Sequence, residues 1–107
     1  MLTPATAETY PALVVKPGAP WRVAHVETLP GHRLQVTFVD GLSGKVEMGP
    51  WLASSAVAGT VFEPLRDEEV FRRVFLDLGA VTWPGGADLA PDAMYDEIRR
   101  NGRWVLE

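Results

Sequence analysis

Between Val81 and Tyr95 a strand-like segment, a tight turn and a helix start follow one another without a spacer, which constrains the fold more than any other feature. Residues 81–83 (VTW) are the β-branched and aromatic types typical of a strand. Residues 84–86 (PGG) turn the chain sharply. Pro91 suits the first turn of a helix, because its missing N–H would have no partner there. The chain is therefore expected to combine strands and helices through short connections.

Upstream of this segment, three strands are predicted to form an antiparallel meander. Residues 33–39 alternate apolar and polar side chains, as in a strand with one buried face. The pair Asp40-Gly41 favours a tight hairpin. Residues 29–32 (LPGH) place proline and glycine where a type II turn prefers them. The flanking strands are predicted at 21–28 and 42–48.

Two helices are predicted to pack against this sheet. The first begins at Asp67, and the second runs from Pro91 to a stop at Asn101-Gly102. A short helical turn is expected over residues 50–56, and a brief strand at Val61-Phe62. The face that the first helix would bury consists of Val70, Phe71, Val74 and Phe75. The predicted fold class is α+β: a small antiparallel β-meander packed against two helices in a single domain.

The domain boundaries follow from the distribution of prolines. Residues 1–20 contain four prolines and few charges, which predicts an extended N-terminal arm, in which residues 13–15 (LVV) could add an edge strand. Residues 21–107 form the compact domain. No cysteine is present, and no apolar run approaches the ~20 residues that span a bilayer, so we expect a cytoplasmic protein without membrane contact.

The charge pattern argues against direct nucleic-acid binding. The net charge is −4, and the whole excess lies in residues 48–107, with six basic and ten acidic side chains. Phosphate backbones are held largely by Lys and Arg, and the one basic cluster (Arg99, Arg100 and Arg103) lies beside Asp96 and Glu97. An acidic second half could attract a basic protein, although a solvated helical surface that keeps a small protein soluble is the favoured explanation.

The sequence offers no set of residues that would carry catalysis. His25 and His32 are the only histidines, and neither has a carboxylate cluster around it in sequence. Asp40 could be proposed as a general base, but the predicted hairpin already requires an Asp-Gly pair at this position. Asp88 near the last helix suits a helix cap better than a cation site, and Asp92 suits the positive end of the helix dipole. We therefore expect no enzyme activity, no metal and no cofactor.

Four tryptophans are numerous for 107 residues. Trp21, Trp51 and Trp83 are interpreted as core residues. Trp104 differs because it follows the predicted stop of the last helix in a short apolar tail. Such a tail either folds back on its own domain or docks on another subunit, and the sequence does not choose between the two.

Three motifs give the chain a resemblance to a small bacterial family of uncharacterised domains. They are residues 38–41 (FVDG), 65–67 (LRD) continuing to Val74, and 82–91 (TWPGGADLAP) continuing to Tyr95. The resemblance covers about residues 21 to 98. It implies an α+β domain with a small antiparallel sheet, and it brings no catalytic residues. Members stand alone, precede a helix-turn-helix domain, or are encoded beside another small protein in an arrangement like a toxin–antitoxin pair.

These observations predict a non-enzymatic protein-interaction or regulatory module, such as the antitoxin-like partner of a small, basic neighbouring protein. The alternative is a small-ligand-binding sensory domain with an aromatic pocket around Trp83 and Tyr95. A homodimer through the tail or a sheet edge is left open. The residues predicted to contact a partner are Trp83, Asp88, Tyr95 and Trp104.

Overall fold

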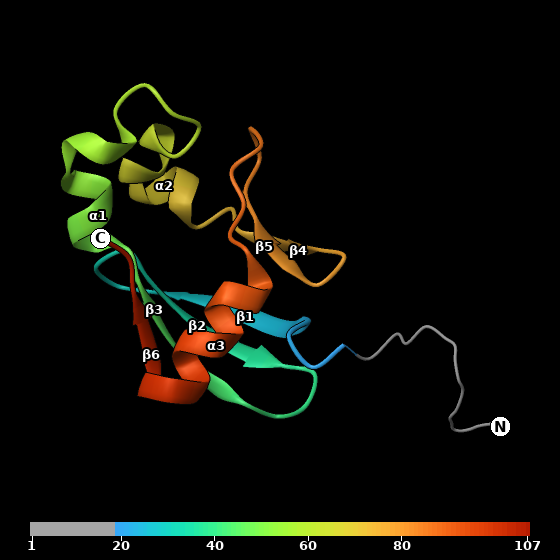
Figure 1. Ribbon diagram of the computed structural model, residues 1–107. Coiled ribbons are helices and arrows are strands. Elements are labelled where there is room, and N and C mark those ends of the chain that lie inside the picture. The colour runs from blue at the N-terminus through green and yellow to red at the C-terminus, as the bar shows by residue number, and fades with distance from the viewer. Residues whose placement is uncertain (1–18) are drawn as a thin grey trace, which may run out of the picture.

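The computed structural model describes residues 19–107. Its main sheet has four strands in the order β1–β2–β3–β6 (Figure 1). They are β1 (Val23–Leu29), β2 (Arg33–Phe38), β3 (Ser43–Glu47) and β6 (Arg103–Val105). The first three form the predicted antiparallel meander, whereas β6 joins β3 in parallel and makes the sheet mixed. The α+β fold class is confirmed. The predicted arm falls on residues 1–18, which lie outside the described part.

The meander forms because polar and apolar side chains alternate along β2. Leu34, Val36 and Phe38 are buried on one face, and the polar side chains between them point to the other. The β2–β3 connection places Gly41 at φ +95°, the left-handed region that a residue without Cβ enters easily. In the β1–β2 turn His32 also has a positive φ, of 57°, which the sequence did not predict.

Helix α3 (Pro91–Asn101) lies across the buried face of the sheet (Figure 1). It buries Met94 and Ile98, and it ends as predicted at Gly102, which has a φ of +80° and donates its N–H to the Ile98 carbonyl at 2.7 Å. The predicted cap by Asp88 is wrong. Ala90 is the residue before the helix, and no side chain caps it.

The helix predicted from Asp67 is much shorter than expected. Helix α2 (Glu68–Phe71) ends before Val74, and β4 (Phe75–Asp77) turns back at Leu78 and Gly79 into β5 (Ala80–Thr82). Both turn residues have positive φ, which suits a tight turn. Pairing of the two segments replaces the predicted helical turn.

The segment between β3 and α2 is built from short helical pieces at one end of the sheet (Figure 1). The short helical turn predicted at 50–56 is confirmed, but the strand predicted at Val61-Phe62 is wrong, because these residues form a turn. The pieces are α1 (Gly49–Ala53), η1 (Ser55–Val57) and η2 (Glu63–Arg66).

The core lies between the sheet, α3 and the helical pieces. Trp83 is 1% exposed, as predicted, and its indole N–H donates to the Phe71 carbonyl at 2.8 Å. Trp51 is half-buried against Phe62, whereas Trp21 is 44% exposed, so its assignment to the core is wrong. No helix within residues 19–107 is long and apolar enough to cross a membrane.

Candidate functional site

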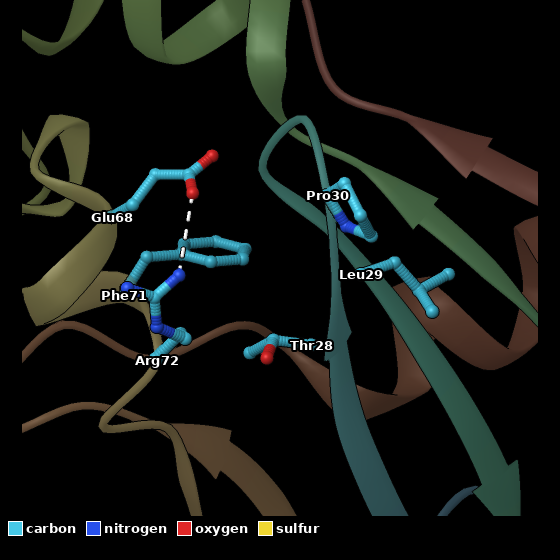
Figure 2. Close-up of a pocket in the computed structure, with 6 residues that line it drawn as sticks. All are labelled: Thr28, Leu29, Pro30, Glu68, Phe71 and Arg72. Atoms are coloured by element: carbon cyan, nitrogen blue, oxygen red, sulfur yellow. Dashed lines mark hydrogen bonds and ion pairs between the residues drawn. The ribbon is translucent and has the colours of Figure 1, made fainter.

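A hollow of about 250 Å³ opens between the end of β1 and helix α2. Figure 2 shows side chains of β1 and its following turn on one side and side chains of α2 on the other. We call it the turn hollow. Its six lining residues are Thr28, Leu29, Pro30, Glu68, Phe71 and Arg72.

The turn hollow has an apolar floor and a charged rim. Leu29, Pro30 and Phe71 supply the apolar surface. On the rim, Arg72 lies 3.4 Å from a Glu68 oxygen and 3.2 Å from a Glu69 oxygen. Glu69 lies outside the lining of the hollow, so within the hollow the Glu68 carboxylate is balanced by the Arg72 guanidinium. The ion pairs themselves are exposed, so each adds little to stability.

His32 supports the hollow from behind. Its Nε2 lies 3.0 Å from the Arg66 carbonyl, which can only accept, so this nitrogen carries the donated proton. The ring packs edge-on against Phe71, with the centroids 5.1 Å apart. Its Nδ1 faces a Glu68 oxygen at 3.9 Å. The ring of this turn residue therefore supports the floor of the hollow at Phe71.

Arg66 holds the neighbouring helical pieces together. Its Nε donates to the Leu52 carbonyl at 2.6 Å, and its Nη2 donates to the Ser54 carbonyl at 2.9 Å. These bonds satisfy carbonyls at the end of α1 that have no partner inside the helix. Because the Arg66 carbonyl also meets His32, the position of the turn hollow depends on this arginine.

A second feature joins α3 to the β2–β3 connection. The Tyr95 hydroxyl donates to Asp40 Oδ2 at 2.5 Å, and the Leu42 N–H donates to Asp40 Oδ1 at 3.0 Å. The bond from Tyr95 is the main cause that lowers the pKa of Asp40 below its usual 3.8, and the same bond raises the pKa of Tyr95 above 10. The bond thus favours the ionised carboxylate of Asp40 and the neutral hydroxyl of Tyr95. In these forms it links α3 to the β2–β3 connection.

The four predicted contact residues are not brought together in one site. Trp83 is buried against Phe71, so its position does not support direct contact with a partner. Asp88 is exposed, and its backbone forms an isolated antiparallel β-bridge with Thr82. Tyr95 is bonded to Asp40. Trp104 is half-buried in β6, so the tail folds back on its own domain.

Sequence reasoning missed the residues of the turn hollow. Glu68 and Arg72 form a pair at the i,i+4 helical spacing, but nothing in the sequence placed Pro30 opposite them. Glu69 pairs with the same arginine at the i,i+3 spacing. The Pro30-Gly31 turn was the one sequence feature that pointed to this surface, because binding residues often lie on surface loops.

Within residues 19–107 no group of three or more His, Asp or Glu side chains is placed to hold a metal ion. His25 and Glu27 pair at 3.4 Å on the exposed face of β1, away from the turn hollow. The turn hollow offers an apolar surface beside the Glu68–Arg72 ion pair.

Comparison with known proteins identifies the family. Residues 23–100 match the family described as "Protein of unknown function (DUF2442)". No curated protein and no solved structure matches the chain. The matched residues run from the start of β1 almost to the end of α3 and include the whole turn hollow. The chain therefore belongs to the DUF2442 family of proteins of unknown function.

Proposed function

We propose that this protein is a non-enzymatic interaction module that binds a protein partner, and that the turn hollow receives one side chain of that partner. The size of the hollow carries this proposal. Its volume of about 250 Å³ is below the ~300–1,000 Å³ of typical small-molecule pockets. A hollow of this size suits a single protruding side chain better than a whole ligand.

The chemistry of the hollow favours a lysine or arginine from the partner. Such a side chain can lay its methylene stem on Pro30 and Phe71 while its charged head meets the rim. The Glu69 carboxylate, which contacts Arg72 from outside the lining of the hollow, is a second negative charge that a cation from the partner can meet. A basic partner is therefore the expected one.

The most specific form of this proposal is an antitoxin-like role, in which the partner is a small basic protein encoded beside this one, in the cytoplasm. The resemblance to proteins encoded in such pairs supports it. The acidic excess of residues 48–107 supports it further, because attraction between opposite net charges speeds encounter.

The alternative of an aromatic ligand pocket has less support. Trp83 is packed against Phe71 with its indole N–H satisfied, and Tyr95 is bonded to Asp40. Neither Trp83 nor Tyr95 lines the turn hollow.

The experiment is co-expression of the tagged chain with the product of the neighbouring gene, followed by affinity purification at low and high salt. We expect a stoichiometric complex that dissociates as salt rises, because screening weakens charge pairs near the surface. The double variant Glu68→Gln, Glu69→Gln keeps the shape of the rim and removes the two carboxylates that contact Arg72, which stays positive, and it should retain markedly less partner.

The matched control is Asp77→Asn, which removes one exposed negative charge from β4, away from the turn hollow. It should bind as the wild type does. Equal retention by the Glu68→Gln, Glu69→Gln variant and the wild type would refute the proposed site. Purification of the chain without any partner at low salt would refute the proposed function.

A further inference from the structure

The outer edge of β6 carries backbone groups that have no partner within residues 19–107. The Leu106 N–H bonds to the Glu47 carbonyl of β3 at 3.0 Å. Backbone groups of successive strand residues point to alternate sides, so Trp104 and Leu106 face β3. The N–H and C=O groups of Arg103, Val105 and Glu107 then face away from the sheet. No described strand pairs with this edge.

The opposite edge of the sheet is different. There the N–H of Val23 bonds to the Gly79 carbonyl at 2.9 Å, so the β4–β5 turn covers the start of β1. Figure 1 shows this hairpin beside β1, whereas β6 forms the far margin of the sheet. An exposed strand edge is a template for pairing with another strand.

The side chains along the open edge are suited to an interface. Val105 is 38% exposed, and Trp104 and Leu106 are half-buried. Two shallow hollows of about 430 and 540 Å³ run along this edge, and Glu97, Val105 and Glu107 line both of them. A strand laid against β6 would cover both hollows.

We infer that a second copy of this chain occupies this edge, with the two β6 strands pairing antiparallel across a two-fold axis at Val105. In this register the outward-facing groups of Val105 bond to Val105 of the other copy, and those of Arg103 bond to Glu107 of the other copy. Arg103 and Glu107 thus lie directly opposite each other twice in the dimer, and Trp104 lies opposite Leu106. Every pair across the axis is apolar or oppositely charged.

Charge selects this register among those that use the outward-facing groups. A two-fold axis at Arg103 would place two arginines opposite each other. An axis at Trp104 would place Arg103 opposite Val105 and leave Glu107 without a partner. Only the axis at Val105 pairs both charges, so the edge is complementary to itself. This surface is distinct from the turn hollow, and the dimer does not depend on the proposed function.

The seam is short, so the dimer should be reversible. A standard stable interface buries ~800 Å² on each partner, and five residues on each side supply only part of that. We therefore expect a mass that rises from 11.7 kDa toward twice this value as protein concentration increases about a hundredfold. Sedimentation equilibrium of the full chain measures this directly.

Two sets of variants test the register. Val105→Pro removes one outward-facing N–H without touching a bond to β3, and Val105→Thr is its matched control. The proline variant should stay monomeric, and the threonine variant should associate like the wild type. In the second set, Arg103→Glu should weaken association about tenfold, because it replaces two attractive pairs with two repulsive ones. Combining it with Glu107→Arg should restore association.

Thermal unfolding checks that each variant remains folded. A wild-type chain that stays monomeric over the whole concentration range would overturn the inference. So would association of folded Val105→Pro equal to that of Val105→Thr. If Val105→Pro does not fold, the charge exchange decides: a double variant no better than Arg103→Glu refutes the register, and recovery supports it.

Discussion

Gly44 is the point of closest approach between α3 and the sheet, and its replacement by alanine should destabilise the protein. A Cβ at this position would lie 2.6 Å from a methyl carbon of Ile98 and 2.7 Å from the Gly102 carbonyl oxygen. Real Cβ contacts essentially never fall below 3.0 Å, so one of the two elements must move. The carbonyl belongs to the backbone that ends α3, which cannot rotate away as a side chain can.

Two opposing effects set the size of the loss. Overpacking a close-packed site costs about 1–3 kcal/mol. Replacing glycine by alanine in a strand returns about 0.5–1 kcal/mol, because the unfolded chain loses freedom. Gly44→Ala should therefore lower the free energy of unfolding by about 1–2 kcal/mol. Urea unfolding followed by tryptophan fluorescence measures it.

Ser43→Ala is the control, since Ser43 is exposed in the same strand and should change stability by less than ~0.5 kcal/mol. In the double variant with Ile98→Ala, one of the two clashes disappears, so the combined loss should be smaller than the sum of the single losses. Gly44→Ala as stable as Ser43→Ala would show that α3 does not approach the sheet as described.

Three further substitutions test other contacts. The pKa of Asp40 is lowered in the fold, so its ionised form stabilises the protein above its ordinary pKa of 3.8, and that contribution is lost as the pH falls through the lower folded value. Tyr95→Phe should return the Asp40 pKa toward 3.8, as measured by carboxyl NMR titration, and an unchanged pKa would contradict the assigned cause. Trp83→Phe leaves the buried Phe71 carbonyl without its donor and should cost at least ~1–3 kcal/mol in urea unfolding; a loss below ~0.5 kcal/mol would mean that the bond is replaced. Gly102→Ala forces a left-handed backbone onto alanine and should cost about 1 kcal/mol in the same assay, whereas unchanged stability would refute the αL helix end.

Local signals in the sequence predicted the meander and α3 because these elements depend on nearby residues. Alternation along β2 and the Asp-Gly pair set the β2–β3 hairpin, and Pro91 with Gly102 marked the ends of α3. These cues act over a few residues, and no distant segment competes with them. The same holds for the turn after Trp83.

The helix predicted from Asp67 is shorter than expected because the residues that follow it form a tight hairpin, and this pairing outweighs helical preference. Val74 and Phe75 share a helical face with Val70 and Phe71, but Phe75 instead pairs with Thr82 across a tight turn. Four apolar residues at helical spacing do not reveal such a competing pairing. Strand β6 was missed for a different reason, because its parallel partner β3 lies far earlier in the chain.

The candidate site depended still more on long-range contacts. The hollow joins residues of β1 and α2 that are far apart in sequence, and His32 reaches the Arg66 carbonyl across 34 positions. Periodicity and composition carry no information about such pairs. The acidic excess of the second half agrees with the proposed basic partner, but it does not locate the hollow.

Hydrogen–deuterium exchange of the chain, free and bound to the product of the neighbouring gene, tests the central proposal most directly. We predict that binding slows exchange in residues 28–31 and 67–72, the two sides of the turn hollow, and leaves β4 unchanged. Protection confined to β6, or no change in either segment, would contradict the account.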